Sequence, residues 1–315
     1  MVGNIPAREA AVHMNTYRRQ PLTLVRGQGT RVWDDEGRSY LDFIAGIAVD
    51  ALGHAHPGLT EVIAKQAGTL IQVSNLFYTE PQIELAELLV GSSALDRVFF
   101  CNSGAEANEA AIKMARKWGI LNRNGAYEII ATHNGFHGRT LGSVAATGTP
   151  RYRDPFGPML PGFVFVDFDD VDAIKAATTA NTAAVLLEPI QGEGGVHVLD
   201  DAFLVAAREA CDAHGALLIL DEVQTGIGRT GAWFAFQRTP VRPDVITLAK
   251  GLASGLPIGA VLSRDLGDAG FRPGDHGTTY GGSPAVAAGA LATLDAVEAQ
   301  GRSEEHTSEL QSRGL

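Results

Sequence analysis

Cysteine is scarce in this chain of 315 residues. Cys101 and Cys211 are the only two, too few and too far apart in sequence for a disulfide framework or a set of metal ligands. Long hydrophobic runs are also missing, since stretches such as residues 216–220 fall far short of the roughly 20 residues that a membrane-spanning helix needs. The first residues include Arg8 and Glu9 and no apolar signal core. We therefore expect a cytoplasmic protein without a membrane segment.

Positive charge is in deficit. The chain has 25 Lys and Arg against 36 Asp and Glu, a formal net charge of −11. A nucleic-acid partner is normally met by a basic surface, so this balance argues against one. Anionic ligands must then be held by individual groups rather than by the overall field. The hydrophobic content of 45% is enough for a sizeable core.

The central part of the chain alternates short β-branched or aromatic runs with longer alanine-rich stretches at helical spacing. This pattern predicts an α/β fold, doubly wound, with a mostly parallel sheet covered by helices. The predicted strands span residues 97–101, 127–132, 163–166, 183–188, 216–221, 245–248 and 258–263. The predicted helices include residues 105–121, 171–177 and 202–214.

The two ends of the chain have different patterns. Residues 30–34 and 39–43 flank Glu36-Gly37-Arg38, which predicts a β-hairpin. The alanine-rich pattern stops near Gly301. Residues 302–315 are polar and resemble a translated sequencing adapter, so we expect a non-native tail there and leave it out of the functional reasoning.

Two predicted strands end in residues that carry chemistry. Asp221 closes the strand 216–221, and Lys250 follows the strand 245–248. An acid and an amine at strand ends are the layout of a pyridoxal-phosphate enzyme, because this cofactor needs an amine for a Schiff base and a carboxylate beside its pyridine nitrogen. Such a carboxylate keeps the ring nitrogen protonated, since a nearby opposite charge shifts a pKa by ~1–3 units. For an isolated pair, a helix cap and a surface lysine are the alternatives.

The segment Asn102-Ser103-Gly104-Ala105 follows one predicted strand and opens a predicted helix. Free backbone N–H groups and the helix dipole meet at such a point, which suits a phosphate. Ser103 taken by itself fits a plain helix N-cap better than a phosphate site.

A glycine-rich turn after the strand 127–132 holds Phe136 and Arg139. The ring of Phe136 could cover the pyridine ring, with core packing as the alternative. Arg139 is the candidate for a substrate carboxylate, because a guanidinium binds a carboxylate through two parallel hydrogen bonds. A surface salt bridge is the alternative for a lone arginine.

Two other patterns argue against other classes of site. His133 and His137 have the spacing of zinc ligands on a helix, but Gly135 and Gly138 argue against a helix there, so we predict no metal site. The stretch QGEGG at 191–195 lacks the glycine spacing of a dinucleotide fingerprint, which argues against a nicotinamide oxidoreductase.

Five motifs in sequence order carry a family resemblance. They are NSGAEAN at 102–108, FHGRT at 136–140, EPIQGEGG at 188–195, DEVQTG at 221–226 and TYGG at 279–282. Together they resemble the class III aminotransferases, and the resemblance extends from about Leu24 to about Gly301. It implies a fold-type I pyridoxal-phosphate enzyme with a large cofactor-binding domain over residues 51–301. Residues 1–50 would form the N-terminal part of a small domain that is incomplete here, because the family's C-terminal segment is not in the sequence.

The resemblance also implies roles for single residues. Ser103, Gly104 and Ala105 would hold the cofactor phosphate. Thr278 or Thr279 of a neighbouring subunit would assist them, which implies a homodimer with its active site at the interface. Gln224 would contact the 3-oxygen of the cofactor.

On the substrate side, the resemblance assigns three charged residues. Arg139 would take the α-carboxylate of N2-acetylornithine and the distal carboxylate of glutamate. Glu193 would pair with an arginine of the missing C-terminal segment, and Glu188 would support the site from behind.

The implied reaction interconverts N2-acetylornithine and 2-oxoglutarate with N-acetylglutamate 5-semialdehyde and glutamate, in arginine biosynthesis. Two alternatives stay open. One is a class III aminotransferase acting on ornithine, succinylornithine or 4-aminobutyrate. The other is an inactive, truncated remnant of such an enzyme.

Overall fold

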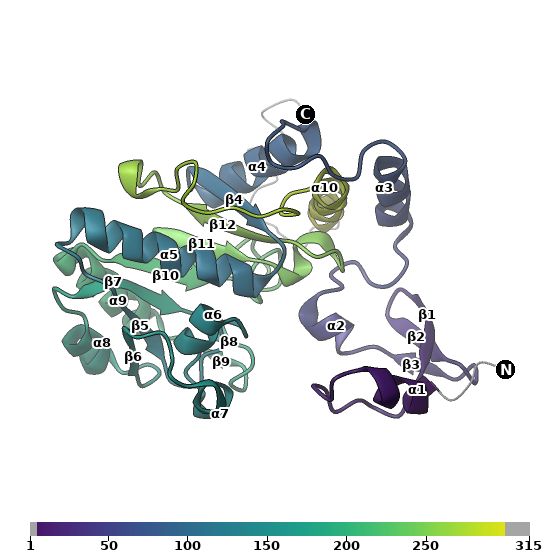
Figure 1. The fold of residues 1–315 in the computed structure, drawn as a ribbon, viewed down its shortest axis with the longest axis horizontal. Coiled ribbons are helices and arrows are strands. Elements are labelled where there is room, and N and C mark those ends of the chain that lie inside the picture. Colours follow the sequence, from purple (N-terminus) through teal and green to yellow (C-terminus); the bar gives the residue numbers. More distant parts are fainter. Residues whose placement is uncertain (1–4, 300–315) are drawn as a thin grey trace.

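The computed structural model describes residues 5–299, and a seven-stranded sheet forms its centre (Figure 1). The strand order is β4-β12-β11-β10-β7-β5-β6. Only β12 runs antiparallel to its neighbours β4 and β11, so the other six strands share one direction. The strands are β4 (Arg97–Cys101), β5 (Glu128–Thr132), β6 (Phe163–Val166), β7 (Thr182–Leu187), β10 (Leu217–Asp221), β11 (Val245–Leu248) and β12 (Gly259–Ser263). The predicted α/β fold with a mostly parallel sheet is confirmed.

The four strands β7, β10, β11 and β12 are buried at every residue. Helices on both faces cause this burial, which explains the continuous apolar runs in place of an alternating pattern. Leu217 and Ile219 pack into the apolar cluster under α5 (Gly104–Asn122). Leu218 and Leu220 face the opposite way, into the cluster under α9 (Asp201–His214).

Most of the remaining helices lie around the large sheet, while α1 and α2 lie beside a smaller one (Figure 1). Helix α10 packs against α3, α4 and the 3-10 turn η3, and α8 packs against α9. Their bounds are α1 (Ile5–Val12), α2 (Ala45–Ala48), α3 (Pro57–Ala67), α4 (Glu80–Ser93), α6 (Leu141–Ala146), α7 (Pro150–Arg153), α8 (Val171–Ala177) and α10 (Pro284–Ala299), with η1 (Asp154–Phe156), η2 (Ala235–Arg238), η3 (Lys250–Ala253) and η4 (Gly267–Ala269).

A second, antiparallel sheet of three strands lies apart from the large one (Figure 1). It consists of β1 (Leu24–Gln28), β2 (Arg31–Asp34) and β3 (Ser39–Leu41). The predicted hairpin is confirmed as β2 and β3, which pair in antiparallel register. Strand β1 and the short hairpin of β8 (Ile190–Gln191) and β9 (His197–Val198) were not predicted. The expected tail at 302–315 lies outside the described residues.

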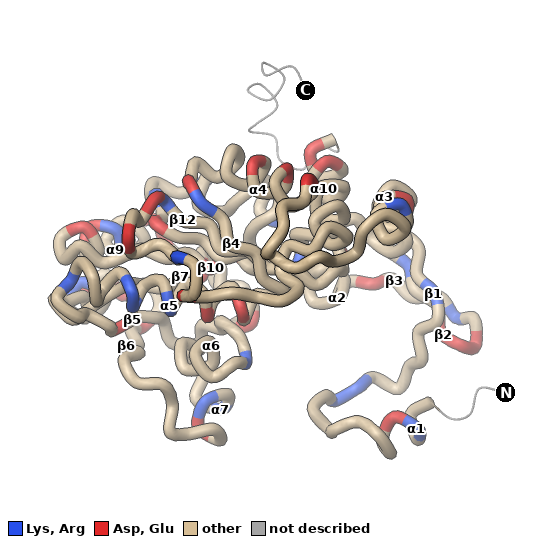
Figure 2. Tube along the Cα trace, turned by 45° about the horizontal axis from the view of Figure 1, so that its top comes forward, with Lys and Arg blue, Asp and Glu red and all other residues tan. Residues whose placement is uncertain are grey.

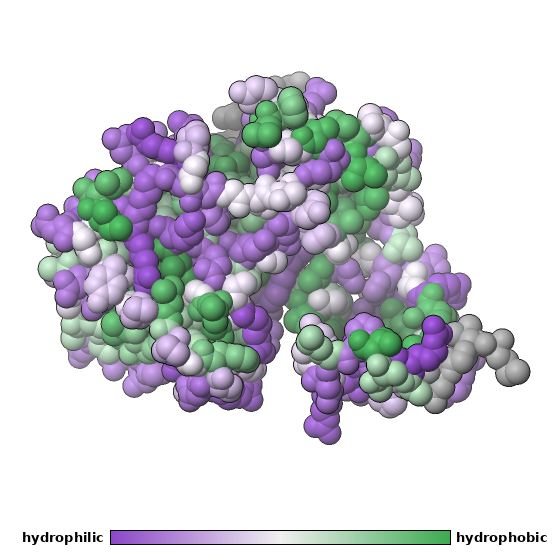
Figure 3. Space-filling model, in the orientation of Figure 1, coloured by the Kyte–Doolittle hydropathy of each residue, from purple (hydrophilic) through white to green (hydrophobic). Residues whose placement is uncertain are grey.

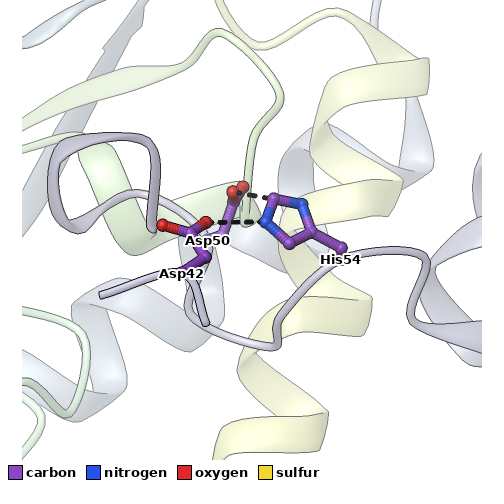
Figure 4. A group of neighbouring side chains, drawn as sticks. All are labelled: Asp42, Asp50 and His54. Atoms are coloured by element: carbon purple, nitrogen blue, oxygen red, sulfur yellow. Dashed lines mark hydrogen bonds and ion pairs between the residues drawn. The ribbon is translucent and has the colours of Figure 1, made fainter. Parts of the chain in front are cut away.

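Three titratable side chains meet beside the small sheet (Figure 4). The Nε2 atom of His54 lies 2.7 Å from Asp42 Oδ2, and its Nδ1 atom lies 3.7 Å from Asp50 Oδ2. The other oxygen of Asp42 accepts hydrogen bonds from the backbone N–H groups of Ile44 and Ala45. Because its two ring nitrogens face different carboxylates, His54 links Asp42 to Asp50.

The charge pattern matches the composition. Figure 2 shows the basic positions spread over the trace rather than gathered along one stretch. Within residues 5–299 we find no helix with the length and apolar character needed to cross a bilayer.

We predict that Gly119→Ala lowers the free energy of unfolding by about 1–3 kcal/mol, the usual cost of overpacking. An added Cβ at Gly119 in α5 would lie 1.8 Å from the carbonyl oxygen of Ala126, a backbone atom that cannot move aside freely. Gly91→Ala in α4 is the matched control, because nothing lies within 4 Å of its added Cβ. The control should gain about 0.5–1 kcal/mol from better helix propensity. Urea unfolding measures the free energy of unfolding of both variants. Equal changes in the two variants would contradict the packing argument.

Candidate active site

The loops that leave the carboxyl ends of β4, β5, β7, β10 and β11 enclose a cavity of about 430 Å3. Parallel strands send their carboxyl ends to one edge of a sheet, so these loops converge there. Ten of the residues singled out in the sequence line this cavity: Ser103, Gly104, Ala105, Phe136, Arg139, Glu188, Glu193, Asp221, Gln224 and Lys250.

The buried carboxylate of Asp221 is surrounded by four donors. Its Oδ2 accepts from Asn108 Nδ2 at 2.7 Å and lies 2.8 Å from His137 Nδ1. Its Oδ1 accepts from the backbone N–H of Val223 at 3.0 Å and from Thr247 Oγ1 at 3.2 Å. Burial opposes ionisation, but the hydrogen bond and charge of His137 outweigh it and hold the pKa of Asp221 below its ordinary range. The carboxylate therefore stays charged.

His137 is the main residue of the site that the sequence reasoning missed, since it was weighed only as a metal ligand. Its ring is fully buried, and burial lowers its pKa, but the bond to Asp221 reverses the effect and raises the pKa above the ordinary value. Its Nε2 atom has no hydrogen-bond partner within residues 5–299. No spacing signal identifies this role, because the partners are 84 residues apart.

Glu188 leaves the end of β7 and lies behind the cavity. Its carboxylate accepts a hydrogen bond from the backbone N–H of Phe136 at 2.9 Å, which ties the turn bearing that ring to the sheet edge. Burial raises the pKa of Glu188 to about 7, and the nearby charge of Asp221 acts in the same direction. This carboxyl group therefore changes its charge near neutral pH.

Lys250 begins η3 with a left-handed backbone, φ 42°. A non-glycine residue in this region is strained, and such strain gathers at functional sites. Partial burial lowers the pKa of Lys250, while the carboxylates of Asp221, Glu193 and Glu188 oppose that shift. A lowered pKa increases the fraction of neutral amine, which is the nucleophilic form.

The N-terminus of α5 opens into the cavity. Ser103 is its N-cap, with the side-chain oxygen accepting from the backbone N–H of Glu106 at 3.2 Å. The first N–H groups of a helix have no partner within the helix, so those of Gly104 and Ala105 are available to an anion. Gly104 has no room for a side chain, because a Cβ would lie 2.8 Å from Val223, another residue lining the cavity.

Arg139 extends along the exposed side of the cavity. Its guanidinium lies 3.9 Å from the ring centroid of Tyr152 and 5.4 Å from that of Phe136. Within residues 5–299 this guanidinium makes no hydrogen bond or ion pair, so its N–H edge is open to a carboxylate. The sequence reasoning did not single out Tyr152.

Thr278 and Thr279 do not line this cavity within one chain. Thr278 Oγ1 instead accepts from Asn102 Nδ2 at 3.1 Å, and the backbone carbonyl of Thr279 accepts from Gln72. Their assignment to the phosphate of a neighbouring subunit stays a prediction.

Comparison with known proteins agrees with this arrangement. The class-III aminotransferase family model matches residues 13–312. The acetylornithine aminotransferase of Methanocaldococcus jannaschii is 53% identical over 292 residues, which cover 92% of this chain and 73% of that protein.

Two solved structures are similar. An ornithine aminotransferase from Toxoplasma gondii, with partial occupancy of PLP at its active site, has a TM-score of 0.88 and 37% identity, over 93% of this chain and 70% of that one. The acetylornithine aminotransferase from Elizabethkingia anophelis has a TM-score of 0.80 and 36% identity, over 94% and 72%. The chain belongs to the class-III aminotransferases.

We predict that Glu188→Gln becomes relatively more stable than the wild type as the pH rises from 5 to 8. With a pKa raised to about 7, the folded protein keeps a proton on Glu188 that the unfolded chain has lost. The contribution of this group to the free energy of unfolding therefore falls as the pH rises toward 7 and is constant above it. The neutral amide removes that dependence.

The measurement is urea unfolding of both proteins, without added cofactor, at four pH values. We expect the free energy of unfolding of Glu188→Gln, minus that of the wild type, to rise with pH. If this difference is flat or falls, Glu188 is ionised throughout the pH range.

Proposed function

We propose that this chain catalyses the interconversion of N2-acetylornithine and 2-oxoglutarate with N-acetylglutamate 5-semialdehyde and glutamate. The observation that carries the proposal is the meeting of Lys250, Asp221 and the N-terminus of α5 in one cavity. The similarity to acetylornithine aminotransferases at about half of all positions supports the choice of substrate.

The residues of the cavity fit pyridoxal 5'-phosphate, which is the cofactor. It supplies an aldehyde that takes up amino groups and a protonated ring that accepts electrons. Asp221 offers a permanent negative charge for the ring nitrogen, because its pKa is held low. Gly104 and Ala105 offer free N–H groups for the phosphate, and Lys250 offers an amine with a lowered pKa for the aldehyde.

The same residues divide the work of amino transfer. Lys250 Nζ is the base that takes the proton from the amino-bearing carbon of the substrate, since a partly buried amine loses its own proton more readily. His137 orients Asp221 and keeps it ionised through the 2.8 Å contact. Phe136 covers one side of the cavity and excludes water, while Gln224 also lines the cavity and would supply a polar contact to the ring oxygen.

Arg139 binds the substrate carboxylates. Both the acylated donor and the dicarboxylate acceptor carry a carboxylate at the end far from the reacting carbon, so one guanidinium serves both half-reactions. Glu193 lies across the same cavity and is exposed. Its role is to pair with a second arginine that binds the remaining carboxylate of the acceptor.

The proposal includes a homodimer in the cytoplasm, with residues 1–50 in a small domain and 51–301 in a large one.

An exposed apolar segment supports the homodimer. It consists of Leu76, Phe77 and Tyr78, which are 86%, 67% and 97% exposed, and such a segment is of the kind that a protein partner covers. Asn75, just before it, donates to the backbone carbonyls of Thr278 and Gly281. If a second copy of the chain covers this segment, Thr278 and Thr279 of the first copy come close to the phosphate site of the second copy. Figure 3 shows hydrophobic surface over the region of α3, α4 and α10.

We predict that Lys250→Ala abolishes amino transfer and the covalent capture of the cofactor by borohydride reduction. Among residues 5–299, no other lysine lines the cavity. Asp221→Asn should keep the fold and lose about 10²- to 10³-fold in rate, the usual loss when one electrostatic partner of the reacting group is removed. Peptide mapping after reduction checks the first outcome, and a labelled lysine other than Lys250 would overturn the assignment.

We predict that kcat/KM is highest for N2-acetylornithine among three donors, the other two being ornithine and 4-aminobutyrate. Arg139→Lys should lower kcat/KM in both half-reactions by about 10- to 100-fold, because a point charge does not replace a two-bond contact. Steady-state kinetics of wild type and variant with each donor give both answers. A preference for ornithine would favour the alternative suggested by the T. gondii neighbour, and absence of turnover with all three would favour an inactive remnant.

A further inference from the structure

The arginine proposed for the substrate carboxylates needs to be held in place. Arg139 is exposed and comes from a loop, and its guanidinium has no hydrogen bond or ion pair with any residue in the described part of the chain. A long, unrestrained side chain loses conformational freedom when it binds a ligand, and that loss weakens binding. Two aromatic rings are the groups that limit its freedom.

The two rings form a corner around the guanidinium. The rings of Phe136 and Tyr152 meet edge to face, with centroids 5.9 Å apart and an angle of 81° between the planes. The guanidinium carbon of Arg139 lies 3.9 Å from the Tyr152 centroid, closer than to Phe136. A cation over a ring face is attracted by the π electrons, while its in-plane N–H groups stay free for a carboxylate.

Tyr152 is itself anchored from outside the cavity. It belongs to the short helix α7, where Arg151 donates to its hydroxyl at 2.8 Å and lies 4.7 Å from its ring centroid. The next residue, Arg153, lies 4.3 Å from the ring centroid of Phe165 in the edge strand β6. The short helix that bears Tyr152 is thus tied to the sheet through Arg153, and the Tyr152 ring contacts Arg151, which does not line the cavity.

We propose that Tyr152 is a positioning residue for substrate binding: its ring holds the guanidinium of Arg139 so that the N–H edge faces the carboxylate of both substrates. The proposal rests on the carboxylate role of Arg139 in the proposed function. The ring face supplies the interaction, so phenylalanine replaces tyrosine at this position and an aliphatic side chain does not. The bond between Arg151 and the hydroxyl is a secondary anchor.

The test compares Tyr152→Leu and Tyr152→Phe in the cofactor-loaded enzyme. Tyr152→Leu should raise KM for N2-acetylornithine and for 2-oxoglutarate by about 3- to 10-fold, the range of a cation–π contact at a partly exposed site. Its kcat and the absorbance of the bound cofactor should stay unchanged, and Tyr152→Phe should restore KM to within about twofold of the wild type. Tyr127→Leu is the matched control, because Tyr127 also lies beside an arginine, Arg116, but away from the cavity.

A binding measurement separates this role from effects on turnover. The ligand is glutarate, a dicarboxylate that carries no amino or keto group. In calorimetric titration, its affinity should fall in Tyr152→Leu by the same factor as KM rises, and should not change in Tyr127→Leu. If Tyr152→Leu is insoluble, Tyr152→Met serves in its place, since it also removes the ring. A fall in kcat and in cofactor occupancy alongside the rise in KM would show that Tyr152 supports the fold of the site, and would overturn the proposal.

A double-mutant cycle with Arg139→Gln tests whether Tyr152 acts through Arg139. In the Arg139→Gln background, removing the ring should raise KM no further. An equal, additive rise in both backgrounds would overturn the inference while leaving the proposed function intact. If Arg139→Gln alone leaves KM unchanged, the carboxylate role of Arg139 fails, and the positioning role of Tyr152 fails with it.

Discussion

The site depends on a carboxylate that is buried and yet kept charged. Isolated, a buried carboxylate would take up a proton, because desolvation penalises the ionised form. Asp221 avoids this through four donors, which come from α5, from the loop after β5, from β11 and from its own turn. Loss of one donor would leave the buried charge less well compensated, so these elements are bound to one another through the carboxylate of Asp221.

Strand direction determines what shares the cavity with Asp221. Because β4, β5, β7, β10 and β11 run in the same direction, their carboxyl ends deliver a helix N-terminus, an aromatic ring, a second carboxyl, the Asp221 carboxylate and an amine to one edge of the sheet. Antiparallel β12 enters from the opposite side and separates β4 from β11. The turn at Ser103 and the amine of Lys250 are therefore separated by this one inserted strand.

The overall charge of the chain opposes its ligands, and local groups reverse that effect. The protein carries a formal net charge of −11 and takes an anionic cofactor and anionic substrates. At short range, the proposed function assigns the phosphate to the dipole and free N–H groups of α5, and the carboxylates to the guanidinium of Arg139. Both are open to the cavity, and at short range such groups outweigh a distant surface charge that salt screens.

The sequence alone determined the parts of this protein that depend on neighbouring residues. Continuous apolar runs identified the buried strands, Ser103 before an alanine-rich stretch identified the start of α5, and strand ends located Asp221 and Lys250. Strand β1 was missed because its LVRGQ sequence holds a glycine and is mostly exposed, so it has no apolar pattern. Only the tertiary structure decided that His137 belongs to Asp221, that burial raises the pKa of Glu188 to about 7, and that Tyr152 stacks on Arg139. These properties depend on burial and on contacts between segments that only the folded sheet brings together, and no local pattern encodes them.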